Sequence, residues 1–344
     1  MINVKKEGIL LHKTELGFEH EGVLNPAVIQ AEGKIHLFYR ALAKDNYSTI
    51  GYCELSSPLV VANRHDTPLL FPLAEYESRG LEDPRIVKLD EVFYLTYTAY
   101  DGVNALGALA TSTDLIHWER HGIVVPQITY EDFKHLAESK GTLNEKYIRY
   151  NEYQKSHDKQ DHTILLWDKN LLLFPRKING TFRIIHRIKP DIQIVVSTES
   201  LDNLTPEFWR EYLLNFDESI VLRPKYDHEV SYIGGGCPPI ETEEGWLLIY
   251  HGVHDSLKGY VYSACAALLD LEHPQKEIAR LPYPLFKPEL EWELKGEVNN
   301  VCFPTGALVI DDTIYIYYGA ADERIAVASV SKSELISELL KYKI

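Results

Sequence analysis

Glu82-Asp83-Pro84-Arg85 is the stretch whose residue types and spacing could do chemistry. Two carboxylates and a guanidinium lie within four residues, directly before an apolar run that is typical of a β-strand. The proline disfavours helical backbone at Asp83, so we expect this residue at the mouth of a strand, where its side chain can point into a cleft. There the carboxyl could protonate a leaving oxygen as a general acid. Because Asp-Pro also opens many turns, the tetrad alone favours a turn over a site.

Further polar residues interrupt apolar runs that are typical of inner strands, among them Arg40, Arg187 and His251. A charged side chain at the end of a buried strand must be paired or must face a solvated cavity. An internal ion pair explains each one separately, but their recurrence at one end of successive strands favours a shared cavity. Arginine, lysine and histidine together predict an anion pocket, because arginine binds phosphate through two hydrogen bonds. The candidates for this cavity are Asn25, Arg40, Glu82, Asp83, Arg85, Lys169, His186, Arg187, Tyr250, His251 and Asp322.

One hairpin pattern recurs five times along the chain. Each unit has a proline, a short strand, an acidic or glycine-containing turn and an aromatic-rich strand, which is typical of a β-hairpin. A third apolar strand follows in most units. The prolines that mark the units lie in Asn25-Pro26, Asp83-Pro84, Phe174-Pro175, Pro238-Pro239 and Phe303-Pro304.

Antiparallel sheets repeated around an axis form a β-propeller. The five units therefore predict an all-β chain, a five-bladed β-propeller that forms a single catalytic domain over residues 1–344. A double-sheet jelly roll is the alternative, but it gives no reason for a proline at the same place in every unit. In a propeller the proline-marked strand starts gather on one face, and this convergence makes the Asp83 tetrad a site rather than a turn. Helical periodicity is nearly absent before a short helix near Ser333.

Two segments do not follow the hairpin pattern. Residues 128–161, between the second and third units, are highly polar and carry Tyr147, Tyr150 and Tyr153. We interpret them as a partly helical insertion that contacts another subunit or caps the funnel, the opening on the face where the strand starts gather. A solvated surface loop is the alternative. Gly234-Gly235-Gly236 ends a second loop and predicts close backbone approach or positive φ. No Lys-Ser/Thr and no helix follow it, so it is not a phosphate-binding P-loop.

The composition excludes several classes of function. The chain has 344 residues, 45% of them hydrophobic, and a net charge of −16, which disfavours nucleic acid and anionic membranes as partners. Its four cysteines are scattered without a CxxC pair, so neither a disulfide framework nor a metal site is expected. No apolar stretch resembles a secretory signal or reaches the length of a membrane span, which predicts a cytoplasmic protein.

Ordered motifs over nearly the whole chain resemble those of glycoside hydrolase family 130. The motifs are Asn25-Pro26 with Phe38-Tyr39-Arg40-Ala41, Glu82-Asp83-Pro84-Arg85, Phe174-Pro175 with His186-Arg187, Gly234-Gly235-Gly236-Cys237-Pro238-Pro239-Ile240 with Tyr250-His251-Gly252-Val253, and Phe303-Pro304-Thr305-Gly306 with Tyr318-Gly319-Ala320-Ala321-Asp322. The resemblance implies a five-bladed β-propeller with inverting activity on β-mannosides, by phosphorolysis to α-mannose 1-phosphate or by hydrolysis.

The resemblance also implies roles for single residues. Asp83 matches the general acid, whose proton passes through a hydroxyl of the bound mannose. Asn25, Arg40 and Asp322 match positions that hold this mannose. Further candidates for substrate binding are Glu82, Arg85 and Tyr250.

The anion pocket distinguishes the two reactions. Phosphorylases that this chain resembles place basic residues at four positions, and the chain offers Lys169, Arg187 and His251 at three of them. Tyr232 stands at the fourth, where lysine is usual. The hydrolases carry glutamate at the positions of Arg187 and Tyr232, and neither is glutamate here. These four residues are therefore predicted to bind phosphate, although Glu229 could act as a displaced base if the alignment of its loop is shifted.

The leading hypothesis is an inverting β-mannoside phosphorylase that uses inorganic phosphate as co-substrate and needs no metal or organic cofactor. Phosphorolysis requires a cationic pocket rather than a strong carboxylate base, because phosphate is itself the nucleophile; inversion requires one acid and a nucleophile on the opposite face. Two alternatives remain open, an inverting β-mannosidase that uses water and a non-catalytic sugar-binding propeller. The short C-terminal helix favours a monomer or a homo-oligomer as small as a dimer.

Overall fold

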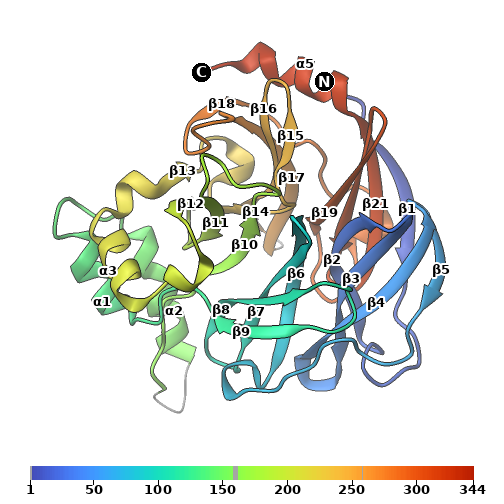
Figure 1. Cartoon of the computed structure of the whole chain (residues 1–344), viewed down its shortest axis with the longest axis horizontal. Coiled ribbons are helices and arrows are strands. Elements are labelled where there is room, and N and C mark those ends of the chain that lie inside the picture. Colours follow the sequence, from blue (N-terminus) through green and yellow to red (C-terminus); the bar gives the residue numbers. More distant parts are fainter. Residues whose placement is uncertain (1, 158–161, 258) are drawn as a thin grey trace.

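The computed structural model describes residues 2–157, 162–257 and 259–344. They form sheets of short antiparallel strands that stand around a common axis as a five-bladed β-propeller (Figure 1). This confirms the predicted all-β fold class. None of the helices in the described part of the chain is long and apolar enough to cross a membrane.

Within each blade the strands follow one another outward from the axis in chain order, except that β1 is the outermost strand of the fifth blade. The first blade contains β2 (Gly22–Ala31), β3 (Lys34–Ala43), β4 (Tyr47–Ser57) and β5 (Val60–Arg64). The second contains β6 (Gly80–Leu89), β7 (Val92–Tyr100), β8 (Ala105–Ser112) and β9 (Glu119–Ile123). The third contains β10 (Lys169–Leu173), β11 (Phe182–Arg187), β12 (Ile192–Thr198) and β13 (Ile220–Leu222).

The fourth blade has a divided innermost strand. It contains β14 (Tyr232–Gly235), β15 (Ile240–Thr242), β16 (Gly245–Ser256), β17 (Gly259–Leu269) and β18 (Glu277–Arg280). The fifth contains β19 (Cys302–Ile310), β20 (Thr313–Ala320) and β21 (Arg324–Ser331), and its outermost strand is β1 (Lys5–Leu11). Because β1 pairs with β21, the N-terminal strand closes the last blade and ties the two ends of the chain together.

Tight turns join the first and second strands of the blades, as the acidic and glycine signals predict. Asp90 and Asp311, at the turns of the second and fifth blades, have φ angles of 53° and 52°. Asp and Asn tolerate this left-handed region better than other side chains with a Cβ atom. The turn residues therefore set the register in which the apolar faces of each hairpin meet.

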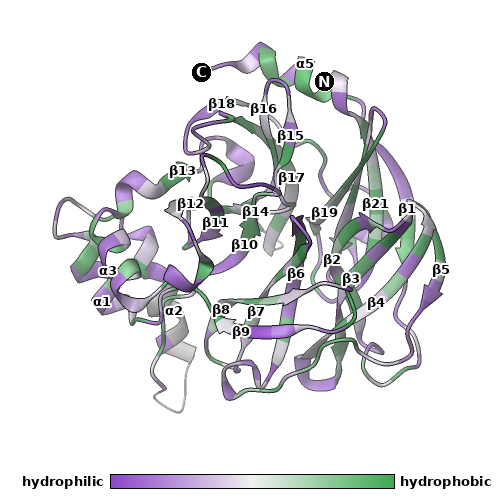
Figure 2. Ribbon diagram, in the orientation of Figure 1, coloured by the Kyte–Doolittle hydropathy of each residue, from purple (hydrophilic) through white to green (hydrophobic). Residues whose placement is uncertain are grey.

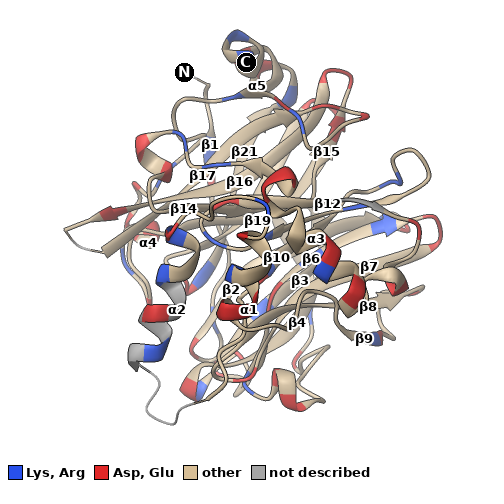
Figure 3. Cartoon of the chain, turned by 90° about the vertical axis from the view of Figure 1, so that its left-hand side faces the viewer, with Lys and Arg blue, Asp and Glu red and all other residues tan. Residues whose placement is uncertain are grey.

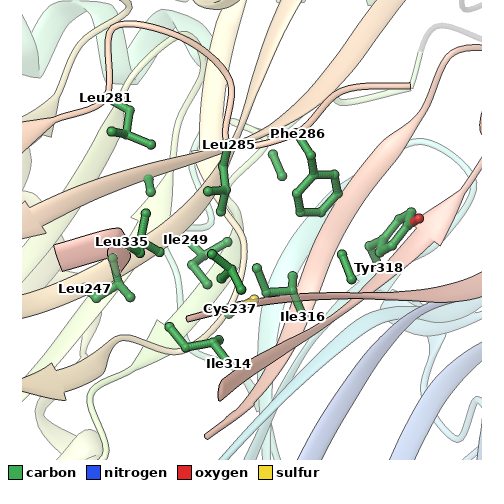
Figure 4. Packing of buried hydrophobic residues seen from close by; sticks show 14 of the residues in the cluster. Cys237, Leu247, Ile249, Leu281, Leu285, Phe286, Ile314, Ile316, Tyr318 and Leu335 are labelled. Carbon is green, nitrogen blue, oxygen red and sulfur yellow. The ribbon is translucent and has the colours of Figure 1, made fainter. Parts of the chain in front are cut away.

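The core lies between neighbouring blades. Apolar residues follow the strands, and polar residues gather at turns and loops (Figure 2). Between the fourth and fifth blades, Ile249 packs with Ile316, Tyr318 and Leu335 in one buried cluster (Figure 4). Charged residues of both signs lie mainly at the ends of strands and on helices and loops (Figure 3). Burial of the blade faces thus holds the ring together and leaves its polar groups at the two ends of the axis.

Two of the predicted unit starts are wrong. In the third blade the innermost strand is β10, so Phe174-Pro175 follows it instead of beginning it. Phe174 is buried against Trp246 of the next blade, with ring centroids 5.0 Å apart. In the fourth blade Pro238-Pro239 lies between β14 and β15. Proline therefore marks the innermost strands without marking the same position in each.

Helices occur outside the blades, and the described residues contain more of them than the sequence predicted. Within 128–161 the described residues include α1 (Tyr130–Ala137) and α2 (Lys146–His157), whereas 158–161 and the side chains of Tyr150 and Tyr153 lie outside the described residues. α3 (Pro206–Leu214), between β12 and β13, was not predicted, although its N-cap Thr205 and the proline at its first position are start signals. α5 (Lys332–Leu339) confirms the C-terminal helix.

The remaining helical turns are short. They are α4 (Glu291–Leu294), η1 (Lys44–Asn46), η2 (Glu75–Glu77), η3 (Leu201–Asn203), η4 (Phe216–Ser219), η5 (Asp227–Glu229) and η6 (Leu340–Tyr342).

Candidate active site

Kinks in the innermost strands place the polar side chains at one end of the axis. The pairing registers of β2, β6 and β10 each shift by one residue, at Asn25-Pro26, Asp83-Pro84 and Asn170-Leu171. Asn25, Asp83 and Asn170 have φ angles of 49°, 50° and 57°. A β-bulge of this kind re-aims a side chain out of the sheet pattern. The feature shared by these strand starts is therefore a kinked Asn or Asp, followed by proline in two of the three.

Asp83 accepts a hydrogen bond from the side-chain amide of Asn25, with 2.7 Å between Nδ2 and Oδ1. Both residues are buried, and Gly319 of the fifth blade leaves room for the amide. A Cβ atom at Gly319 would lie 2.1 Å from Asn25 Oδ1. Strands from the first, second and fifth blades thus meet at the predicted acid.

Arg40 lies beside this pair and connects it to the third blade. Its guanidinium is 2.8 Å from Glu82 Oε1 and 3.8 Å from Asp83 Oδ1. Its Nε donates to Ser48 Oγ over 2.8 Å. Lys169 Nζ is 3.7 Å from the other oxygen of Glu82. Four predicted site residues, Arg40, Glu82, Asp83 and Lys169, therefore form one charged network.

Asp83 and Asp322, two carboxyl groups of the site, have pKa values shifted in opposite directions. Burial disfavours the charged form of Asp83, but the positive charges of Arg40, Arg85 and Lys169 outweigh burial and lower its pKa. At Asp322, burial prevails over the attraction of Arg40 and raises the pKa to about 6. Environments that push the pKa values of neighbouring carboxyl groups apart are typical of acid–base sites.

Arg85 braces the backbone. Its guanidinium donates to the carbonyl oxygens of Asp83, Gly236 and Gly235 over 2.7, 3.2 and 3.4 Å. The side chain is 2% exposed, and burial lowers its pKa to about 10. Arg85 is therefore a positioning residue for Asp83, and the prediction that it binds substrate directly is not supported by this geometry.

The anion pocket forms where β10 and β11 meet β14 and β16. Lys169 and Arg187 are paired across β10 and β11. Gly234 separates Arg187 from His251, and a Cβ atom there would lie 2.6 Å from the imidazole and 2.9 Å from Arg187 Cδ. Close approach, one of the two reasons foreseen for a glycine at this position, therefore applies.

His251 has two vacant hydrogen-bonding positions. Its ring lies against that of Phe303, tilted by 33° with 4.4 Å between centroids. It is fully buried, and neither ring nitrogen has a hydrogen-bond partner among the described residues. Burial, together with the positive charges of Arg187 and Arg85, holds the pKa of His251 well below its ordinary value. The lowered pKa favours the neutral imidazole, which offers one N–H group to a ligand.

Tyr250 and Glu229 lie behind the site. Glu229 is fully buried and accepts from the Tyr250 hydroxyl, while Arg280 Nη1 lies 3.2 Å from Glu229 Oε2. The backbone amides of Lys225 and Tyr226 donate to the same oxygen over 2.8 and 3.2 Å. Glu229 is therefore committed to structure and is not a displaced base. Tyr250 is fully buried and its hydroxyl is bonded to Glu229, a geometry that favours a supporting role over the predicted contact with substrate.

The same three-residue arrangement, called a bracket below, recurs in other blades. In each, a tyrosine of the second strand donates to a buried glutamate, which pairs with a lysine or arginine of the outermost strand. The sets are Tyr39–Glu19–Arg64, Tyr97–Glu77–Arg120, Tyr250–Glu229–Arg280 and Tyr318–Glu293–Lys6. In the third blade, His186 takes the tyrosine's place, with Nδ1 2.8 Å from Asp168 and Nε2 2.7 Å from the Tyr212 hydroxyl. His186 is therefore structural.

The brackets orient the strands that carry the site. Arg40, Arg187 and His251 each directly follow a bracketed ring in the chain. Because successive side chains of a strand point to opposite faces, fixing one ring in the core points the next residue the other way. The described structure thus brings together Asn25, Arg40, Glu82, Asp83, Lys169, Arg187, His251 and Asp322, and it assigns Arg85, Tyr250 and His186 to support.

Two residues near the pocket were not predicted. Ser48 orients Arg40, and Lys189 places its ammonium 3.8 Å from the centroid of the Tyr232 ring. The hydroxyl of Tyr232 meets that of Tyr262. Lys189 lies two residues beyond Arg187, in the loop after β11. The alternation of side chains along a strand does not extend into a loop, so the sequence pattern did not place Lys189 in the pocket.

The fold and the facing acid and cation groups are those of a glycoside-cleaving β-propeller. Residues 14–169 and 147–341 match the profile of glycoside hydrolase family 130, described as β-1,4-mannooligosaccharide phosphorylase. The chain belongs to glycoside hydrolase family 130, which confirms the resemblance seen in its motifs.

Characterised relatives match over the whole length. The chain is 36% identical to a 1,2-β-oligomannan phosphorylase of Thermoanaerobacter sp. (strain X514), over 97% of this chain and 99% of the relative. It is 34% identical to a β-1,2-mannobiose phosphorylase of the same strain, over 97% and 98%.

Solved structures share the fold. The β-1,2-mannobiose phosphorylase of Listeria innocua, solved with β-1,2-mannobiose, superposes with a TM-score of 0.71 at 22% identity, over 98% of this chain and 99% of that one. A glycosyl hydrolase of Bacteroides ovatus superposes with a TM-score of 0.73 at 22% identity, over 96% and 94%.

Proposed function

We propose that the chain is an inverting β-mannoside phosphorylase, which cleaves a β-mannosidic bond with inorganic phosphate and releases α-mannose 1-phosphate. The observation that carries the proposal is the pocket of Lys169, Arg187 and His251 beside Asp83. Glu229, the carboxylate of the neighbouring loop that could have served as a base for water, is held by Arg280 and backbone amides.

The relatives support the same reaction. Both Thermoanaerobacter proteins are phosphorylases of β-1,2-linked mannosides and align over 97% of this chain. A β-1,4-mannooligosaccharide phosphorylase of Ruminococcus albus aligns over 51% of it. We therefore place β-1,2-linked mannooligosaccharides first among the substrates.

In the proposed reaction, Asn25, Arg40 and Asp322 hold the mannosyl unit. A phosphate oxygen attacks the anomeric carbon while the bond to the leaving oxygen breaks, and a proton passes from Asp83 through a hydroxyl of the mannosyl unit to that oxygen. Inversion follows because the reaction is a single displacement, in which phosphate attacks the face of the ring opposite the leaving oxygen.

The charge network couples the acid to phosphate. The positive charges of Arg40, Arg85 and Lys169 lower the pKa of Asp83, which favours its ionised form. A phosphate anion bound to Lys169 and Arg187 offsets their positive charge, so the pKa of Asp83 rises and a proton is retained. Asp83 therefore carries its proton when phosphate is bound.

The experiment that tests this function follows sugar release from β-1,2-mannobiose and β-1,4-mannobiose, with and without phosphate. We expect phosphate-dependent release of α-mannose 1-phosphate, with the β-1,2-linked substrate turned over faster. Release of free mannose without phosphate would instead establish the β-mannosidase. Binding without turnover on either substrate would establish a sugar-binding propeller.

Further parts of the proposal concern the whole molecule. We propose that residues 1–344 act as one catalytic domain, as a monomer or small homo-oligomer, without a metal or organic cofactor. A cytoplasmic location suits this reaction, because the charged sugar phosphate it forms does not cross a membrane unaided.

A further inference from the structure

Lys189 is a cation of the pocket that none of the motifs includes. It follows β11 and lines a cavity of about 550 Å³ together with Arg187, Tyr130, Trp167 and Tyr260. Arg187, two residues earlier, belongs to the candidate phosphate pocket described above. The cavity therefore reaches Arg187, one of the residues expected to bind the anion.

An aromatic ring fixes the position of Lys189. Its ammonium lies 3.8 Å from the centroid of the Tyr232 ring, and the guanidinium carbon of Arg187 lies 5.5 Å from the same centroid. Both distances are within the range of cation–π attraction. The Tyr232 hydroxyl is bonded to that of Tyr262, so the ring is anchored from its far end. The Tyr232 ring thus contacts both Arg187 and Lys189 and holds these two side chains near each other.

This gathering is electrostatically unfavourable in the empty site. Burial, and the positive charges of Arg187 and Lys169, hold the pKa of Lys189 well below its ordinary value. Lys189 in turn contributes to the lowered pKa of His251. An anion with several acceptor oxygens would relieve this repulsion.

We propose that Lys189 is a direct ligand of the phosphate co-substrate and that Tyr232 is the residue that positions it. The inference rests on the proposed function and adds a donor to the site. Tyr232 then acts through Lys189 and Arg187 rather than by binding phosphate with its own hydroxyl, which is engaged by Tyr262.

The test compares Lys189→Met and Lys189→Arg with the unaltered protein, measuring KM for phosphate and KM for β-1,2-mannobiose separately. Methionine keeps the length of the side chain without its charge. We expect Lys189→Met to raise KM for phosphate at least 10-fold with KM for the mannoside unchanged, and Lys189→Arg to recover most of the loss. Lys146→Met is the matched control, because Lys146 lines the same cavity but donates to the Val230 carbonyl over 3.0 Å.

A second variant places a cation where the ring now lies. Tyr232→Lys in the Lys189→Met background should restore part of the affinity for phosphate. Stabilisation by phosphate, measured as the rise of Tm on adding the salt, gives a readout without turnover, and Lys189→Met should lose it.

The outcomes separate this inference from the proposed function. Phosphate-dependent turnover by the unaltered protein together with an unchanged KM for phosphate in Lys189→Met would overturn the role of Lys189 alone. Equal rises in both KM values would show that Lys189 only supports the fold of the pocket, and would also overturn it. Turnover without phosphate by the unaltered protein would overturn both proposals.

Discussion

Asn25 and Asp83 are 58 residues apart in the chain, yet the amide of one donates to the carboxylate of the other over 2.7 Å. Each stands on a bulge of the innermost strand of its own blade, with nearly the same backbone angle. The hydrogen bond therefore joins two blades at the axis and fixes the carboxylate that we expect to act as the acid.

Replacing the acid should stop turnover without unfolding the protein. Asp83→Asn keeps the shape and can still bond to Asn25, but it cannot donate the proton. We expect kcat on β-1,2-mannobiose to fall about 100- to 10,000-fold, the usual contribution of general acid catalysis. Circular dichroism checks the fold, and a near-normal rate would remove Asp83 from this role.

The space beside Asn25 makes a second prediction. Gly319→Ala introduces a Cβ atom 2.1 Å from Asn25 Oδ1, so Asn25 must move, and we expect its hydrogen bond to Asp83 to be weakened or broken. A displaced acid should lower kcat/KM on the order of 100-fold. Gly17→Ala is the control, since nothing lies within 4 Å of a Cβ atom there. Equal activity of the two variants would argue against the importance of the Asn25–Asp83 bond.

Asp322 gives a pH dependence whose sign can be stated. Its pKa is raised from 3.8 to about 6, so the folded protein retains this proton more tightly than the unfolded chain. The contribution of Asp322 to stability therefore falls as pH rises from about 4 to about 6 and stays low above that. We expect Asp322→Asn to raise Tm at pH 7.5 and to have less effect at pH 4.5. A larger rise at pH 4.5 than at pH 7.5 would contradict the raised pKa.

Arg187 should determine the affinity for phosphate. Removing its charge-assisted hydrogen bonds in Arg187→Ala should raise KM for phosphate about 10- to 100-fold, with a smaller effect on KM for the mannoside. Arg176→Ala serves as comparison, because Arg176 forms an exposed pair with Glu241 at 2.7 Å. An unchanged phosphate requirement in Arg187→Ala would contradict the pocket.

Glu229 should matter for stability and not for chemistry. Glu229→Ala removes the carboxylate shared by Tyr250, Arg280 and the backbone amide of Lys225, while Arg280 keeps Glu277 at 2.7 Å. Buried donors left without this acceptor should cost about 1–3 kcal/mol of the free energy of unfolding. Glu241→Ala, at an exposed pair, should cost about 1 kcal/mol or less. Denaturant unfolding measures both, and Glu229→Gln assayed at low temperature tests catalysis. A stable Glu229→Gln protein without turnover would restore Glu229 as a base.

Local patterns predicted most of the strands correctly. The five third strands are β4, β8, β12, β17 and β21, and hairpin turns with acidic or glycine residues join their partners as expected. The predictions that failed, at Phe174 and Pro238, assumed that a proline marks the start of each innermost strand. Proline only limits the backbone near it, and it is compatible with the end of a strand as well as with its start.

The sequence by itself determined the repeat of hairpins, the kinked acid at Asp83 and the family, because turn chemistry and motifs act over a few residues. Only the tertiary structure decided that Glu229, Tyr250 and His186 support the site and that Lys189 enters it. Partners such as the buried Arg280 and the partly buried Tyr212 come from distant strands and helices, and only the tertiary fold determines which of them meet. A polar residue in a strand reads the same in the sequence whether it faces the core or the funnel, and burial with its partners distinguishes the two.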